Sequence, residues 1–315
     1  MKLIIQIPCY NEEETLPQTI QDLPKEIPGI SKIETLIVDD GSSDKTIEVA
    51  ESLGVDHIVR HLDNRGLARS FRSGIDQCLR LGADIIVNTD GDNQYCGQDI
   101  PKLVEPIVNG EASIVIGDRQ TQDVAHFSTG KKLLQKLGSF VVRKLSDTKI
   151  PDAVSGFRAF SRPAAMDLNI VSTFSYTIET IIQAGIKKMT ITSVPIRTNP
   201  KTRESRLFKS IPQFLQRSVG TMVRMYAMYQ PLKVFLTISM VLTVIGIIPI
   251  VRFIIFYQMG EGQGHVQSLV LGGVLFIVGF VTFLIGIVAD LISFNRQLTE
   301  MTLERVRILE EKLSK

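Results

Sequence analysis

The chain has 315 residues, of which 44% are hydrophobic, and its 35 lysines and arginines nearly balance 33 aspartates and glutamates. This length allows one large domain or two ordinary ones, and the balanced charge excludes a bulk attraction to nucleic acid, so no nucleic-acid partner is expected. The three cysteines are far apart and are interpreted as reduced thiols facing the cytosol. The four scattered histidines indicate neither a zinc cluster nor a Ser/His/Asp triad.

Strands and helices alternate along the first part of the chain. β-rich runs occupy residues 2–8, 34–40, 56–61 and 84–90, and helical patterns occupy residues 12–23, 45–54 and 66–82. This rhythm predicts an α/β fold in which a mainly parallel sheet is covered by helices on both faces. Ligands of such sheets bind beyond the carboxyl ends of the strands, and the polar clusters PCYNEEE, DDGSSD and DGDNQY fall at such ends.

Two carboxylates one residue apart, Asp90 and Asp92, follow the apolar run ADIIV. Alternate side chains of a strand point the same way, so both carboxylates are expected on one face at the carboxyl end of the strand. Like charges this close resist ionising together unless a cation or a hydrogen-bond donor neutralises them. A polar turn after a strand is the alternative interpretation of this pair.

Two uncharged apolar runs, residues 234–250 and 266–289, lie late in the chain. Each approaches or exceeds the roughly 20 residues that cross a bilayer, and the connector between them is short and rich in glycine, so the pair predicts a transmembrane hairpin rather than two buried soluble helices. Cations precede the first run and follow the second, and apart from Arg252 the far side has none. This asymmetry predicts an integral, multi-pass membrane protein whose large first domain and both termini are cytoplasmic.

The segment before the hairpin carries a broad apolar stripe interrupted by cations. It is interpreted as one or two amphipathic helices in the membrane interface, and a helix packed on the soluble domain is the alternative. The tail after the hairpin has too short a heptad run to assert a coiled coil. The expected organisation is a cytosolic domain at 1–205, an interfacial segment at 206–231, a transmembrane hairpin at 232–292 and a charged cytosolic helix at 293–315.

The motifs of the first part, in their order, resemble family 2 glycosyltransferases of the GT-A fold. They are IPCYNEE, VDDGSSD, GLARSFRSG, DGDNQY, IGDR, DAVSGFRAFSR and ESRLFKS. The resemblance is specifically to polyprenyl-phosphate glycosyltransferases similar to dolichyl-phosphate mannose synthase. It implies a Rossmann-like GT-A domain with a mixed, mainly parallel sheet, followed here by the interfacial helices and two transmembrane helices.

The resemblance assigns a donor side to the site. It places the nucleotide of a nucleotide-sugar against Pro8, Tyr10, Glu12, Val38, Asp40, Asp90 and Gly91. Simple packing is the alternative for Tyr10, and a turn cap is the alternative for Asp40. Carboxylate and amide oxygens suit the hard cations Mg²⁺ and Mn²⁺. The resemblance gives the metal to Asp92 and Gln94, with Asp90 against the donor or the metal.

The resemblance also assigns an acceptor side. It places the phosphate of a polyprenyl monophosphate near Arg119, Lys131, Ser155, Arg203 and Arg206, and it counts Asp90, Asp92, Arg119 and Asp152 as catalytic. Solvated surface charge is the alternative for Arg119 and Lys131. The family often has an arginine two residues before the glutamate of the ESR motif, where this chain has Thr202, and whether Arg203 replaces its phosphate contact is left open.

The implied reaction is a metal-dependent, inverting transfer of a sugar from a UDP- or GDP-linked donor to a polyprenyl monophosphate at the cytoplasmic membrane face. Mg²⁺ or Mn²⁺ is the expected cofactor, the bilayer is an expected partner, and a homo-oligomer is left open. A processive polysaccharide synthase is a weaker alternative, because the Gln-x-x-Arg-Trp motif of those enzymes needs a tryptophan and the chain has none. A non-catalytic, membrane-anchored nucleotide-binding subunit is the second alternative.

Overall fold

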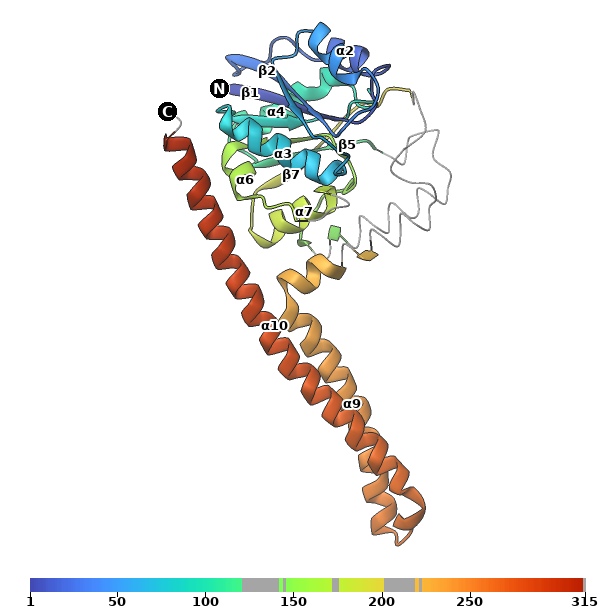
Figure 1. The fold of residues 1–315 in the computed structure, drawn as a ribbon. Coiled ribbons are helices and arrows are strands. Elements are labelled where there is room, and N and C mark those ends of the chain that lie inside the picture. The colour runs from blue at the N-terminus through green and yellow to red at the C-terminus, as the bar shows by residue number, and fades with distance from the viewer. Residues whose placement is uncertain (121–141, 144–145, 172–175, 201–218, 221–222, 314–315) are drawn as a thin grey trace. The chain divides into compact units, whose positions relative to one another are not determined.

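The computed structural model describes residues 1–120, 142–143, 146–171, 176–200, 219–220 and 223–313 (Figure 1). The chain divides into two compact units. The first comprises Met1–Met222 with Val306–Lys315, and the second comprises Val223–Arg305.

The first unit is built on a seven-stranded sheet of order β3-β2-β1-β4-β6-β5-β7. The strands are β1 (Lys2–Cys9), β2 (Lys32–Asp39), β3 (His57–Arg60), β4 (Ile85–Asn88), β5 (Ile114–Asp118), β6 (Arg158–Ser161) and β7 (Ile191–Pro195). Strand β6 pairs antiparallel with both neighbours, and the other pairs are parallel. The mixed, mainly parallel sheet expected from the sequence is therefore confirmed.

The single reversed strand determines which ends of the sheet meet. Because β6 runs antiparallel to both β4 and β5, those two strands run in the same direction. The carboxyl ends of β1, β2, β4, β5 and β7 therefore share one edge of the sheet, and the turn that leads into β6 reaches the same edge. Ligands of such sheets bind at this edge.

Helices cover both faces of the sheet, as the alternation predicted. One face carries α1 (Leu16–Gln21), α2 (Thr46–Ser52) and α4 (Ile100–Val108), and the other carries α3 (Leu67–Arg80), α6 (Arg162–Asp167) and α7 (Tyr176–Ile186). Along β1, Leu3, Ile5 and Ile7 join the core under the first set, while Gln6 faces α3. This alternation is what a strand buried on both faces requires.

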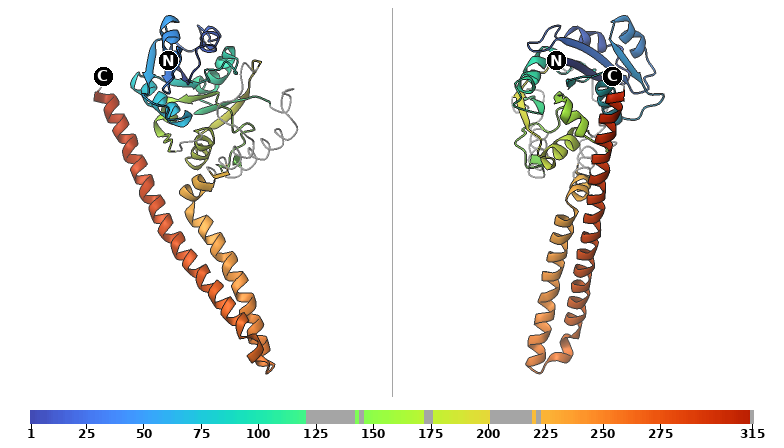
Figure 2. Two further views of the ribbon diagram at one scale, coloured as in Figure 1. Left: turned by 45° about the vertical axis from the view of Figure 1, so that its right-hand side comes forward. Right: turned by 90° about the vertical axis from the view of Figure 1, so that its left-hand side faces the viewer.

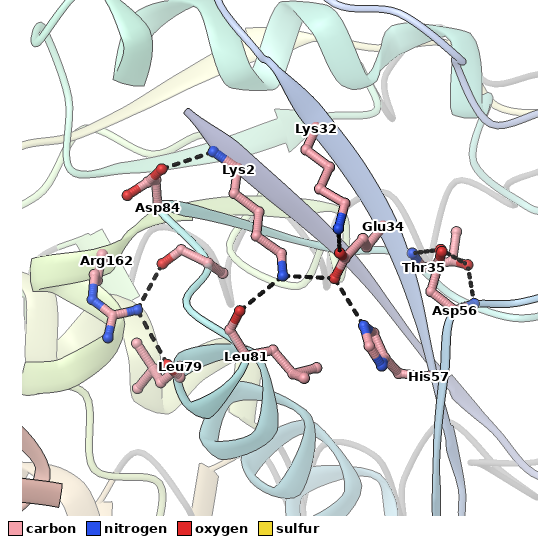
Figure 3. A network of polar contacts seen from close by, with 11 residues as sticks. Lys2, Lys32, Glu34, Thr35, Asp56, His57, Leu79, Leu81, Asp84 and Arg162 are labelled. Carbon is pink, nitrogen blue, oxygen red and sulfur yellow. Dashed lines mark hydrogen bonds and ion pairs between the residues drawn. The ribbon is translucent and has the colours of Figure 1, made fainter. Parts of the chain in front are cut away.

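A polar network holds the edge of the sheet opposite to the carboxyl ends (Figure 3). The carboxylate of Glu34 is almost fully buried, forms ion pairs with Lys2 at 2.8 Å and Lys32 at 2.6 Å, and makes a hydrogen bond with Nε2 of His57 at 2.8 Å. Lys2 also donates to the carbonyl of Leu81, just beyond the end of α3. Burial by itself would raise the pKa of Glu34, but hydrogen bonds from Lys2, Lys32 and His57 together lower it to about 2.

We therefore expect Glu34→Gln to lower the free energy of unfolding by about 1–2 kcal/mol at pH 7. Since the pKa of Glu34 is lower in the folded state, its stabilisation is present above the unfolded pKa, roughly 4.3, and is lost as pH falls toward 2. Thermal melting of the full chain in detergent between pH 7 and pH 3 should give melting temperatures for the variant and the wild type that converge. A difference that stays constant with pH would contradict this assignment. Glu48→Gln, at an exposed position on α2, is the control and should change little.

The second unit contains two long helices, α9 (Pro231–Gln258) and α10 (Val266–Leu313), which lie side by side and are joined through the short helix η2 (Gly262–His265) (Figures 1 and 2). By length and composition both are long and apolar enough to cross a membrane. Only 11% and 17% of their most apolar windows is buried, unlike the core helices of a soluble domain. Helix α10 continues without a break from the apolar run through the charged tail.

Before α9, residues 223–229 are helical. Ser293 donates to the carbonyl of Met228 at 3.0 Å, and the guanidinium of Arg296 lies 3.6 Å from the ring centre of Tyr229. The end of this helix is therefore attached to α10. Most of the predicted interfacial segment lies outside the described residues, so its amphipathic character stays a prediction.

The two long helices approach each other through small residues. A Cβ built on Gly272 would lie 2.7 Å from the carbonyl oxygen of Gly246, and one built on Gly279 would lie 2.6 Å from the hydroxyl oxygen of Thr243. Ser239 donates to the carbonyl of Gly279 at 2.7 Å. Small residues that let backbones come this close are typical of helix pairs in membranes.

Replacing Gly279 with leucine should therefore force α9 and α10 apart by steric overlap. A distance measured between spin labels on the two helices, with the full chain in detergent, should increase. Gly273→Leu is the matched control, because a Cβ at Gly273 meets nothing within 4 Å. Equal distances in both variants would show that the packing of α9 against α10 does not depend on Gly279.

Candidate active site

The loop after β4 carries the two carboxylates that the sequence singled out. Strand β4 ends at Asn88, so Asp90 and Asp92 lie in the loop rather than in the strand. The expectation that strand alternation aligns them is therefore wrong. Instead, the carboxylate of Asp92 accepts the backbone N–H of Gln94 at 3.2 Å, and Asn93 between them is left-handed with φ 53°. The shape of the loop, not a strand face, determines where these oxygens lie.

Gly91 attaches this loop to the segment after β1. Its carbonyl accepts hydrogen bonds from the hydroxyls of Thr15 at 2.9 Å and Thr19 at 3.1 Å. A Cβ built on Gly91 would lie 3.0 Å from Cys9 Sγ and 3.3 Å from Glu12 Cγ, so a side chain there would push the loop away. The structure thus brings Glu12 and Gly91 together, as the resemblance implied. The threonines were missed, although two hydroxyls one helical turn apart were visible in the sequence.

The ends of β1 and β2 bring the other expected nucleotide residues side by side. Pro8 lies opposite Val38, and the N–H of Asp40 donates to the carbonyl of Cys9 at 2.9 Å. The side chain of Val38 is fully buried, so its backbone is the part that can meet a ligand. Tyr10 is 39% exposed and is not a core residue.

Asp40 organises the loop that leads into α3. Its carboxylate accepts the backbone N–H groups of Arg65 at 3.0 Å and Gly66 at 2.8 Å, and it contacts Nδ1 of His61 at 2.8 Å. Nε2 of His61 in turn contacts the hydroxyl of Ser73 at 3.0 Å. Sequence spacing did not indicate this series of contacts between Ser73, His61 and Asp40. Because Asp40 also accepts hydrogen bonds from two backbone amides, we interpret these three residues as a support for the loop rather than as a nucleophile and its base.

A buried ion pair lies beyond the end of β5. Nε of Arg119 donates to Asp152 at 2.7 Å and Nη2 donates at 3.0 Å, while the side chains are 13% and 2% exposed. Burial by itself would raise the pKa of Asp152, but the charge and hydrogen bonds of Arg119 lower it. Burial by itself would lower the pKa of Arg119, but the charge of Asp152 raises it, with a smaller contribution from Asp90. Both groups stay ionised, so Arg119 is not a solvated surface cation.

The turn before β6 lies against Asp90. A Cβ built on Gly156 would lie 3.2 and 3.3 Å from the two carboxylate oxygens of Asp90. The N–H of Gly156 donates to the hydroxyl of Tyr95 at 2.9 Å, and its carbonyl accepts from the amide of Asn88 at 2.9 Å. The ring of Tyr95 also stacks on Phe157 with the ring centres 5.1 Å apart. The predicted donor and acceptor sides therefore meet at Gly156, where a Cβ would also lie 2.8 Å from the hydroxyl oxygen of Tyr176.

The buried side chain of Arg158 holds the backbone of this turn through hydrogen bonds. It is fully buried and donates to the carbonyls of Ala153 at 3.0 Å, Ser155 at 2.8 Å and Thr177 at 2.8 Å. Burial lowers its pKa to about 10, so it carries a positive charge at neutral pH. The hydroxyl oxygen of Ser155 is buried and makes no hydrogen bond within the described part of the chain. Sequence reasoning did not single out Arg158, since a buried arginine is not visible in a motif.

The donor set of the loop fits a hard divalent cation. Asp90, Asp92 and Gln94 are all partly accessible and offer oxygen only, which is what Mg²⁺ and Mn²⁺ prefer. Among the described residues no group of three or more His, Cys, Asp and Glu side chains could hold a metal ion, and the role of Gln94 as a ligand stays a prediction. Lys131, Arg203 and Arg206 lie outside the described residues, and their roles stay predictions.

The pattern described as Glycosyl transferase family 2 matches residues 4–168, more than half of the chain. The chain belongs to glycosyl transferase family 2.

Two relatives and one solved structure are similar to this glycosyltransferase. The UDP-N-acetylglucosamine–dolichyl-phosphate N-acetylglucosaminyltransferase of Methanococcus voltae is 29% identical over 213 residues, covering 61% of this chain and 83% of the relative. The dolichol-phosphate mannosyltransferase of Pyrococcus furiosus is 31% identical over 229 residues, covering 69% and 62%. Glucosyl-3-phosphoglycerate synthase from Mycobacterium tuberculosis, solved with Mn²⁺, UDP and glucosyl-3-phosphoglycerate, is 16% identical with a TM-score of 0.54 over 72% of this chain and 78% of that one. The structural likeness supports the GT-A fold.

The ion pair of this family 2 glycosyltransferase should matter for stability. Asp152→Asn leaves the charge of Arg119 buried without its carboxylate, and we expect a loss of about 3 kcal/mol in the free energy of unfolding. Asp167→Asn removes the carboxylate from a more exposed pair with Lys187 and should cost less than about 1 kcal/mol. Denaturant unfolding of the full chain in detergent compares the two. Equal small losses would contradict a tightly buried pair.

Proposed function

We propose that this glycosyltransferase transfers a sugar from a UDP- or GDP-linked donor to a polyprenyl monophosphate, with inversion at the anomeric carbon. The observation that carries the proposal is the closeness of Gly156 to Asp90, since a Cβ built on Gly156 would lie 3.2 and 3.3 Å from the carboxylate oxygens of Asp90. It joins the donor side of the site, at the ends of β1, β2 and β4, to the acceptor side before β6. The two dolichyl-phosphate relatives support the class of acceptor.

The acceptor needs little or no base. A phosphate monoester is ionised at neutral pH, so its oxygen can attack the anomeric carbon without losing a proton. One carbon–oxygen bond forms to the acceptor phosphate, the carbon–oxygen bond to the diphosphate breaks, and the nucleoside diphosphate leaves. Attack from the side opposite to the leaving group inverts the configuration.

The chain contributes position and charge. Asp152 fixes the guanidinium of Arg119 through two hydrogen bonds, which orients it before any ligand arrives. In this orientation Arg119 offers its positive charge to the acceptor phosphate as that phosphate approaches the donor. Arg158, beneath the turn, adds a second buried positive charge and holds the backbone of the acceptor side.

The cofactor is Mg²⁺ or Mn²⁺. Asp92 and Gln94 would hold it, with Asp90 beside the metal or the donor. When bound, the ion stabilises the negative charge that develops on the leaving diphosphate.

The second unit would anchor the enzyme in the bilayer. Its helices α9 and α10 are long and apolar enough to cross a membrane, and the cations that flank the apolar runs favour a cytoplasmic position for the catalytic domain and both termini. An integral, multi-pass enzyme of this orientation would meet the phosphate headgroup of a polyprenyl lipid at the cytoplasmic face.

The test mixes the purified full chain with UDP-glucose, GDP-mannose or UDP-N-acetylglucosamine, undecaprenyl or dolichyl phosphate, and Mg²⁺. We expect one donor to release its nucleoside diphosphate and to give one lipid-linked sugar. EDTA and Asp92→Ala should each reduce transfer at least a hundredfold, consistent with loss of charge stabilisation worth about 3 kcal/mol, and added Mg²⁺ or Mn²⁺ should reverse only the effect of EDTA. Full activity in EDTA would contradict the metal assignment. A polymeric product would indicate a processive synthase, and no release with any donor would indicate a non-catalytic subunit.

A further inference from the structure

The segment after β7 pairs with the loop that carries the predicted metal ligands. Thr198 forms an antiparallel bridge with Tyr95. The N–H of Cys96 donates to the carbonyl of Arg197 at 3.3 Å, and the N–H of Asn199 donates to the carbonyl of Gln94 at 2.9 Å. A short two-stranded contact therefore runs along the loop, directly after the expected ligands.

Arg197 anchors this segment at one end. Its backbone N–H donates to the carboxylate of Asp99 at 2.7 Å, and its guanidinium donates to the same carboxylate at 2.8 and 3.2 Å. The side chain of Asp99 is fully buried, and Lys102 forms a second ion pair with it at 2.9 Å. These contacts with Asp99 hold Arg197 in place, two residues before Asn199 in the sequence.

Asn199 holds the backbone of the loop with its side chain as well. Its amide nitrogen donates to the carbonyls of Asn93 at 3.0 Å and Tyr95 at 3.4 Å. An amide has two N–H donors, so both bonds can form together. With its backbone bond to Gln94, Asn199 contacts three consecutive carbonyls. Pro200 follows and restricts Asn199 to an extended conformation.

These contacts bear on the shape of the loop between Asp92 and Gln94. Asn93 adopts a left-handed conformation, which asparagine tolerates better than most residues but which is still uncommon for a residue with a side chain, so contacts to its backbone help to keep it. The side-chain oxygen of Asn93 is buried and makes no hydrogen bond to the described residues, so the side chain of Asn93 does not hold the turn through this atom. The side-chain amide of Asn199 is one group that holds this turn, through its hydrogen bonds to the carbonyls of Asn93 and Tyr95.

We propose that Asn199 is a positioning residue for the metal: it holds the loop in the shape in which Asp92 and Gln94 can bind one ion. The proposal rests on the proposed function, since it takes the metal assignment from it. Residues that orient metal ligands from outside the ligand set typically change metal affinity by about 10- to 100-fold when they are replaced.

The experiment measures Mn²⁺ binding to the full chain in detergent, with UDP or GDP present, from the electron paramagnetic resonance signal of free Mn²⁺. Asn199→Ala and Asn199→Asp should each raise the dissociation constant for Mn²⁺ about tenfold or more. Asparagine and aspartate have nearly the same shape, so the second variant removes the donors and adds repulsion toward the carbonyls. Thr198→Ala is the control, because the bridge to Tyr95 uses the backbone, and it should bind Mn²⁺ as the wild type does.

Two further readouts separate positioning from a general loss of structure. Nucleotide affinity without metal should change less than twofold in the Asn199 variants, and the melting temperature should stay close to that of Thr198→Ala. Hydrogen exchange at the amide of Cys96 should become faster in Asn199→Ala, whether or not metal is present.

The outcomes distinguish the two proposals. A wild-type chain that binds Mn²⁺ while both Asn199 variants bind it equally well would overturn this inference and leave the proposed function in place. Equal losses of Mn²⁺ affinity, metal-free nucleotide affinity and stability would also overturn it, because Asn199 would then be merely structural. A wild type that binds no Mn²⁺ with either nucleotide would overturn the metal assignment of the proposed function, and this inference with it.

Discussion

The reversed strand β6 is the constraint on which the site depends. Placed between β4 and β5, it brings its preceding turn to the edge where the parallel strands end. A parallel strand in the same place would deliver that turn to the opposite edge. This reversal places Gly156 beside Asp90, where a Cβ on Gly156 would lie 2.8 Å from the hydroxyl oxygen of Tyr176 and 3.2 and 3.3 Å from the carboxylate oxygens of Asp90.

Two arginines near Gly156 are held in place by contacts within the protein, so the proposed reaction would need little rearrangement of their charges. Arg119 is held by Asp152 through two hydrogen bonds, and Arg158 donates to backbone carbonyls of the same turn. Both guanidinium groups have already lost most of their water, so the cost of desolvating them is met in folding rather than in catalysis. Preoriented charge of this kind is the usual source of stabilisation when a transition state accumulates charge on phosphates.

Local pattern predicted the strands up to β4 and the helices between them, because each alternation of polarity is decided by the residues of its own segment. Local pattern gave wrong or no predictions where the conformation depends on contacts with segments that are distant in the sequence. Asp90 and Asp92 lie in a loop whose backbone accepts hydrogen bonds from Thr15, Thr19 and Asn199, and no spacing in the sequence connects these positions. The partnership of Arg119 with Asp152 was equally hidden, although both residues stand in motifs that were recognised. The resemblance supplied the candidate residues, and the sheet order explains why those that the structure describes lie near the same end of the sheet.

Helix α10 has a mechanical consequence that follows from its length alone. It runs for 48 residues without a break, which corresponds to about 72 Å at the rise of an α-helix. The hydrocarbon core of a bilayer accounts for about 30 Å of that. With α10 placed across a membrane as proposed, the remainder would extend beyond the lipid surface as an arm of continuous helix. Since spanning helices tilt to match local thickness, a thicker or thinner bilayer would swing the end of this arm sideways, by roughly 10 Å for a change of about 10° in tilt.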